Sequence, residues 1–130
     1  MRPTLLLGAA ALLAAAPASA QPAPGQLVPA PVQVINLQSY SYAPTPIHLA
    51  AGRPVTLHFV NRAGKSHDFT AREFFSAARI LSGQVANGEI DLRGGQSASV
   101  TLVPAAGRYK VHCGHPFHAL LGMRSVIVVR

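Results

Sequence analysis

The sequence contains little cysteine, few acidic side chains and no long apolar stretch. Cys113 is the one cysteine among 130 residues, which excludes a disulfide within the chain. A length of 130 residues also excludes a multi-domain enzyme, because it allows one domain and a short additional segment. The lone thiol is therefore inert, bonded to another molecule, or used in chemistry.

The N-terminal apolar stretch is too short to cross a membrane. Residues 4–16 supply thirteen apolar-type positions, whereas a bilayer-spanning helix needs roughly 20. Arg2 precedes the stretch, and the small residues Ala18, Ser19 and Ala20 follow it as a cleavage site. This order predicts a secretory signal peptide over residues 1–20, export to the periplasm and no membrane insertion.

Acidic side chains number four, against ten basic ones once Arg2 is removed with the signal peptide, so the mature net charge is +6. This excess favours encounters with acidic partners. The basic residues are scattered singly, with no run of five or more. A nucleic-acid binder would also be misplaced outside the cytoplasm. We therefore expect a solvated basic surface and no nucleic-acid ligand.

The mature chain divides into a lead-in and one domain. Residues 21–31 hold four of the eleven prolines and should be an extended, mobile lead-in. From residue 32 onward, short segments alternate apolar with polar side chains and are separated by turn signals. The predicted strands are residues 32–37, 46–50, 55–60, 100–103, 109–113 and 124–129.

One segment has helical spacing. Within residues 71–81, Phe74, Ala78 and Leu81 fall on one face, and we expect Phe74 and Phe75 to pack in the core. About seven short strands at regular spacing predict an all-β fold. The expected architecture is a Greek-key β-sandwich or flattened barrel over residues 32–130, with one short helix.

Metal-ligating side chains occur in two compact regions. Residues 61–69, interpreted as a loop after the strand at 55–60, contain His67. Residues 109–123 contain Cys113, His118 and Met123 in the spacing C-x4-H-x4-M. A thiolate, two imidazoles and a distant thioether form the trigonal site with a weak axial methionine that holds copper. The second imidazole must come from elsewhere in the chain, and His67 is the natural donor.

These motifs resemble those of the small cupredoxins, the blue copper proteins of the plastocyanin/azurin type. The matching residues are Gly52, Val55 and Asn61, the His-Asp-Phe at 67–69, the Tyr-x-Val-x-Cys at 109–113, and Gly122-Met123. The length of the C-x4-H-x4-M loop is similar to that of rusticyanin and auracyanin. The fold expected from the strands is thus the cupredoxin fold.

The resemblance implies one type 1 copper per chain, with His67, Cys113 and His118 as equatorial ligands and Met123 as the axial ligand. It implies that Asp68 ties the two ligand loops together by hydrogen bonds. It also implies that the apolar residues flanking His118 form a patch through which electrons pass to a docked partner.

Two other histidines are alternative ligands. His115 could replace His118, and His58 could replace His67. His112 should point away from the site, because successive residues of a strand face opposite sides.

Further alternatives concern packing and metal identity. Cys113 and Met123 could be core residues that bind no metal. At least one of Leu120 and Leu121 is expected in the core. Zinc would also accept these ligands.

The sequence supports two hypotheses of function. The first is a monomeric, periplasmic one-electron carrier whose copper cycles between Cu(II) and Cu(I) and whose acidic partners dock around His118. No general acid, base or open coordination position is placed beside the copper, so we expect no enzymatic turnover. The second is a copper-binding or trafficking protein, for which His112 and His115 would suit transient metal binding. A metal-free structural domain is a third reading, against which the complete ligand set argues.

Overall fold

The structure of the chain is a computed structural model that describes residues 28–130. The expected signal peptide (residues 1–20) and residues 21–27 of the expected lead-in lie outside the described residues. No helix within the described range is long and apolar enough to cross a membrane.

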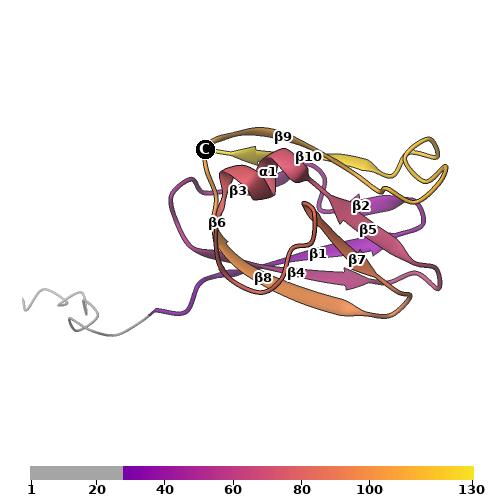
Figure 1. The fold of residues 1–130 in the computed structure, drawn as a ribbon, viewed down its shortest axis with the longest axis horizontal. Helices are drawn as coiled ribbons and strands as arrows, with labels where there is room; N and C mark the ends of the chain where they lie inside the picture. Colours follow the sequence, from indigo (N-terminus) through magenta and orange to yellow (C-terminus); the bar gives the residue numbers. More distant parts are fainter. Residues whose placement is uncertain (1–27) are drawn as a thin grey trace, which may run out of the picture.

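Residues 28–130 form ten strands in two five-stranded sheets that lie face to face (Figure 1). In spatial order, the first sheet contains β2 (Ser41–Ala43), β1 (Val32–Gln38), β4 (Val55–Asn61), β8 (Ser97–Val103) and β6 (Arg79–Ser82). The second contains β3 (Ile47–Leu49), β10 (Arg124–Val129), β9 (Gly107–His112), β5 (His67–Thr70) and β7 (Glu89–Leu92). Most neighbouring strands are not consecutive in the chain, as in a Greek-key arrangement. The predicted all-β sandwich with one short helix is confirmed.

The core lies between the sheets and follows from period-two alternation. In β4, Leu57 and Phe59 are fully buried, and their neighbours in sequence are half-buried. Leu57 pairs with Val100 of β8, which is also fully buried. Alternate side chains of a strand point to one face of its sheet, so both strands direct their apolar residues toward the second sheet. Ile127 of β10 is a fully buried core residue contributed by that second sheet.

The predicted helix over residues 71–81 is too long. Helix α1 (Arg72–Ala77) makes little more than one turn, and Ala78 is already extended. Residues Arg79–Ser82 instead form strand β6, which pairs with β8, and Leu81 is exposed. One turn is enough to bury Phe74 and Phe75, so the expectation that both pack in the core is confirmed.

The interpretation of residues 61–69 as a loop is wrong at its end, because His67 begins strand β5. The side chain of Asn61 closes the turn that precedes this strand. Its Nδ2 donates to the carbonyl oxygens of Lys65 (2.8 Å) and Leu92 (2.9 Å), and its Oδ1 accepts from the backbone N–H of Ala63 (2.9 Å). These bonds precede the return of the chain into the second sheet, where His67 begins β5 between β9 and β7.

Candidate metal centre

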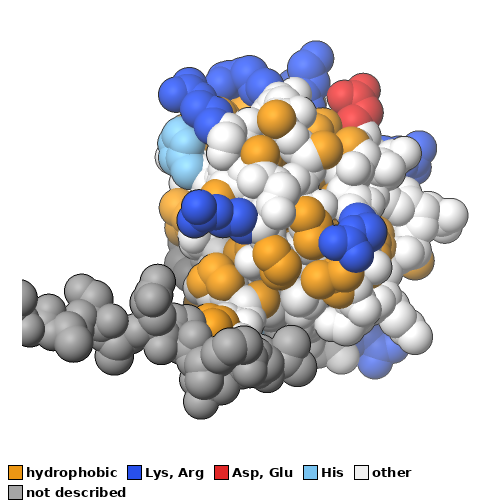
Figure 2. All heavy atoms as spheres, turned by 90° about the vertical axis from the view of Figure 1, so that its left-hand side faces the viewer, with side chains coloured by type: hydrophobic (Ala, Val, Ile, Leu, Met, Phe, Trp, Pro, Cys, Tyr) orange, Lys and Arg blue, Asp and Glu red, His pale blue; other side chains and the backbone are white. Residues whose placement is uncertain are grey.

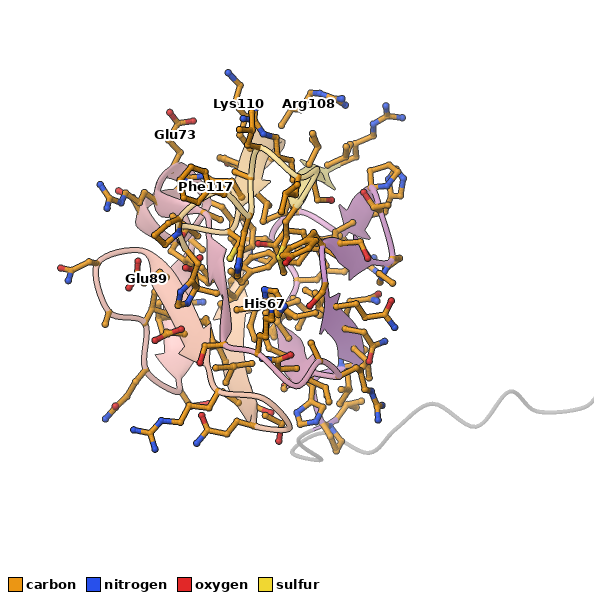
Figure 3. The ribbon with its side chains drawn as sticks, turned by 90° about the vertical axis from the view of Figure 1, so that its right-hand side faces the viewer. His67, Glu73, Glu89, Arg108, Lys110 and Phe117 are labelled. Carbon is orange, nitrogen blue, oxygen red and sulfur yellow. The ribbon has the colours of Figure 1, made fainter. Side chains whose placement is uncertain are left out.

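Three sequence-predicted ligands meet at one end of the sandwich. His67 is the first residue of β5, Cys113 directly follows β9, and His118 lies in the loop between β9 and β10. Their ligating atoms all lie within 4.8 Å of one another. The His67 Nδ1 and His118 Nδ1 atoms are 3.1 Å apart, and the Cys113 Sγ and His118 Nδ1 atoms are 3.4 Å apart. Figure 3 views this end, with His67 labelled near its centre.

The ring of His67 is oriented by a residue that sequence reasoning missed. Its Nε2 lies 2.8 Å from the hydroxyl of Ser39, so its Nδ1 faces His118. Tyr40, next in the turn between β1 and β2, places its ring against both imidazoles, with centroids 5.9 Å from His67 and 4.9 Å from His118. Partners of this kind fix the orientation of a ligating histidine. The local sequence around Ser39 carries no signal that would link it to a histidine 28 residues away.

Burial governs the protonation of the two innermost donors. Burial lowers the pKa of His67, and the neighbouring His118 lowers it further. The imidazole therefore stays neutral, which is the form that binds metals. Burial raises the pKa of the Cys113 thiol, while the backbone N–H groups of Asp68 and His115 act in the opposite direction. A cation that binds here replaces the thiol proton, because the thiolate is the ligating form.

Asp68 joins the two ligand-bearing segments, as expected. Its Oδ1 and Oδ2 accept the backbone N–H of Gly114 at 2.8 Å and 2.9 Å. Oδ1 also accepts the hydroxyl of Thr70 at 2.6 Å. On the backbone side, the buried hydroxyl of Tyr42 donates to the Asp68 carbonyl, and burial raises the pKa of Tyr42 far above its ordinary value. Tyr42 therefore remains protonated and keeps this bond.

The side chain of Met123 is fully buried, and its backbone is hydrogen-bonded to two of the other candidate ligands. Its carbonyl accepts the backbone N–H of Cys113 at 3.1 Å, and its own N–H donates to the carbonyl of His118 at 3.0 Å. These two bonds join the first and last residues of the C-x4-H-x4-M loop, and also its middle and last residues. All four predicted ligand residues are thus brought to one region.

The geometry separates His115 from the three grouped donors. The Nε2 of His115 lies 3.1 Å from Asp91 Oδ1 on β7 and 3.8 Å from Asp68 Oδ2. Its imidazole therefore belongs to a second group of donors, with Asp68 and Asp91, that does not include the Cys113 thiol. The Asp68 carboxylate in that group is already occupied by Gly114 and Thr70.

The other rival histidines lie elsewhere. His58 places its Nδ1 2.7 Å from the hydroxyl of Ser99 on the sheet of β4 and β8. His112 is exposed and pairs in register with Arg124, so it points away from Cys113, as expected. The structure favours His67 and His118 as the two imidazole donors.

The ligand loop carries an exposed apolar patch around half-buried His118. Phe117 is 76% exposed, Leu120 78% and Leu121 58%. The expectation that Leu120 or Leu121 packs in the core is wrong. The loop closes on its own backbone, with Leu121 N–H donating to the Phe117 carbonyl at 2.9 Å, and Met123 is the loop residue that fills the interior.

The donor set fits copper. A thiol, two imidazoles and a thioether combine soft sulfur ligands suited to Cu(I) with nitrogen ligands that also suit Cu(II). Within the described residues, the grouped donors around Cys113 include no carboxylate, the ligand type preferred by magnesium and calcium.

Comparisons with known proteins agree with this chemistry. Residues 30–130 match the family described as copper binding proteins, plastocyanin/azurin family. No curated protein sequence matches the chain. Auracyanin B is a similar solved structure, with a TM-score of 0.59 and 23% identity over 81% of this chain and 92% of that one. Dithionite-reduced auracyanin from Roseiflexus castenholzii is similar with a TM-score of 0.58 and 20% identity, over 76% of this chain and 96% of that one.

A multicopper oxidase from Campylobacter jejuni shares the fold with a TM-score of 0.61 and 11% identity, over 84% of this chain but 32% of that one. At these identities the solved structures show the fold alone. The match of residues 30–130 covers nearly the whole described part and includes every candidate ligand. The chain therefore belongs to the plastocyanin/azurin family of copper-binding proteins, and its cofactor is copper.

Proposed function

We propose that the chain is a type 1 copper protein that carries single electrons. His67, Cys113 and His118 would hold one copper ion, together with Met123. The observation that carries this proposal is the grouping of the three donor atoms within 4.8 Å at the end of a closed sandwich.

The chain's own residues hold the donors in place. Ser39 fixes the ring of His67, Asp68 ties Gly114 to β5, and Met123 holds the backbone of Cys113. Bound copper supplies the one-electron chemistry by alternating between Cu(II) and Cu(I). Because hydrogen bonds hold the donor-bearing segments in place, the ligands would move little when the copper changes oxidation state, which would favour rapid electron transfer.

The apolar patch supports a carrier that hands electrons to other proteins. Phe117, Leu120 and Leu121 surround His118, the one grouped donor that is only half-buried. A docked partner would exclude water there and approach the imidazole edge. The Campylobacter jejuni oxidase is about three times the length of the shared domain, so its name supports no oxidase activity here. With the signal peptide expected at residues 1–20, we place the carrier in the periplasm as a monomer.

Reversible redox cycling in the presence of a competing chelator tests this function. The copper-loaded protein is cycled by voltammetry and then incubated with the Cu(I) chelator bicinchoninate. A carrier gives a reversible one-electron wave and retains its copper for hours. A trafficking protein instead loses its copper within minutes, and that result would contradict the proposal.

A matched pair of histidine variants controls the assignment. His118→Ala should lose the reversible wave, because one equatorial ligand is removed. His115→Ala should keep it, because the imidazole of His115 pairs with Asp91, and the substitution leaves the backbone of the loop unchanged. The reverse result would show that His115 is the ligand.

A further inference from the structure

The outer face of strands β9 and β10 carries a line of basic side chains that the sequence shows only as scattered residues. Arg108, Lys110 and His112 alternate outward on β9, while Val111 between them is buried. Arg124 of β10 lies opposite His112 in register. Figure 3 shows Arg108 and Lys110 projecting together at the top of the molecule. In Figure 2, Lys and Arg side chains gather along the same upper edge.

This face is hollowed. One hollow of about 440 Å³ is lined by Lys110, His112, Arg124 and, from the ligand loop, Ala119. A second, of about 350 Å³, is lined by Arg108 and Pro46 and shares Arg124, Ser125 and Val126 with the first. Together they form a groove, here named the basic groove, that runs from the residue next to His118 along the sheet to Arg108.

The cations of the basic groove are available to a partner. Within residues 28–130, the ion pairs all involve His115, and none involves Arg108, Lys110 or Arg124. Arg124 lines both hollows, and its Nε donates to the Ala119 carbonyl at 3.0 Å.

The acidic residues are largely segregated from this face. Three of the four acidic residues lie on β5 and β7, which follow β9 toward the opposite edge of the same sheet: Asp68, Glu89 and Asp91. Figure 3 shows Glu89 well away from Arg108 and Lys110, whereas Glu73 of α1 points toward the same side as Lys110 without an ion pair between them. The groove therefore presents a concentrated positive field.

We propose that the basic groove binds a carboxylate-rich segment of an acidic redox partner protein. Alternate residues of a strand repeat every 6.6 Å or so, which matches the side-chain repeat of an extended acidic segment. Arg and Lys make strong charge-assisted hydrogen bonds to carboxylates. Because the groove ends at Ala119, a partner bound there also covers the apolar patch at His118. A concave groove suits a protruding segment better than a flat lipid surface.

The redox role of the partner rests on the proposed function. The binding of a carboxylate-rich segment to the basic groove does not. Such an arrangement raises the association rate and orients the partner, and salt weakens both effects. The basic groove thus gives part of the net positive charge of the chain a specific role in binding.

The test is titration of the copper(I)-loaded protein with a hexaglutamate peptide, monitored by amide NMR shifts at low ionic strength. The expected shifts fall in β9, β10 and Ala119. Arg108→Glu/Lys110→Glu should weaken the peptide about tenfold, because two contacting charges are reversed. The control Arg53→Glu/Arg79→Glu reverses two exposed charges outside the groove and should weaken it no more than about twofold.

Equal weakening by both double variants would overturn the proposal, because net charge alone would then explain binding. It would also be overturned if the peptide failed to bind while phosphatidylglycerol vesicles bound in an Arg108- and Lys110-dependent manner. The titration is repeated on copper-free protein. Localised binding there, together with failed redox cycling, would support the groove and remove the proposed redox function.

Discussion

Asp68 shows at the scale of one residue how the ligand segments are held together. The side chain is almost completely buried, and its oxygens accept the Gly114 N–H and the Thr70 hydroxyl. A buried carboxylate is tolerated only when donors of this kind compensate its desolvation. The link between β5 and the residue after Cys113 is therefore built into the protein before any metal binds.

Replacing Asp68 should measure that link. Asp68→Ala should lower the free energy of unfolding by about 2–3 kcal/mol, because the Gly114 N–H and Thr70 hydroxyl lose their acceptor. Asp91→Ala, which removes a largely exposed carboxylate from adjacent β7, should change it by less than about 0.5 kcal/mol. Urea denaturation of the copper-free proteins gives both values, and equal losses would contradict the role assigned to Asp68.

Met123 provides a second prediction for a single residue. Met123→Leu should retain the intense thiolate-to-copper absorption, because the equatorial donors and the buried volume are preserved. It should raise the reduction potential, because the weak axial donor is lost. Voltammetry measures the change, and an unchanged potential would leave Met123 as a packing residue alone.

At the scale of elements, β4 lies at the centre of the first sheet, between β1 and β8, and its buried apolar residues are part of the core. Leu57→Ala in β4 should lower the free energy of unfolding by about 2–5 kcal/mol through the cavity it leaves. Leu81→Ala, on edge strand β6, should cost less than about 1 kcal/mol, because Leu81 is 45% exposed. Similar losses in the two variants would contradict this assignment of the core.

The strands that could be predicted from the sequence are those in which apolar and polar side chains alternate within the strand itself. The alternation of Val55, Leu57 and Phe59 specifies a half-buried strand without reference to the rest of the chain. By contrast, all four residues of β5 are buried, so His67–Thr70 shows no alternation. Strand β6 follows helix-like spacing and forms because β8 offers hydrogen bonds at its edge. Such short strands depend on their neighbours in space.

The candidate site likewise contains residues that local spacing predicts and residues that come together only in the folded chain. Cys113, His118 and Met123 lie within one loop, so their spacing alone predicts a common site. His67 lies 46 residues before Cys113, so local spacing does not pair it with the loop; it was named as the natural second imidazole donor, and the family resemblance implied the same role. Ser39 and Tyr40 were missed, because their contacts with the histidines arise only when the turn between β1 and β2 is placed beside β5 and the ligand loop.

At the scale of the whole molecule, the metal centre is a preformed end of a folded sandwich. Removing copper with a chelator should therefore lower the melting temperature and leave the β-sheet circular dichroism unchanged. Copper should stabilise the fold by about 4 kcal/mol when its free concentration exceeds the dissociation constant about a thousandfold. Loss of sheet signal on removal would show that the site forms only with its metal.

The copper centre, and the electron carrier proposed from it, depend on one claim: that Cys113 is a copper ligand. The most direct test is a titration of the protein with Cu(II), followed by visible absorption and electron paramagnetic resonance, beside the same titration of Cys113→Ser. We predict an intense thiolate-to-copper band and a narrow copper hyperfine splitting that saturate at one copper per chain. Both should be absent from Cys113→Ser, whose circular dichroism should match that of the native chain. A weak spectrum typical of surface histidine binding, identical in the two proteins, would contradict the claim.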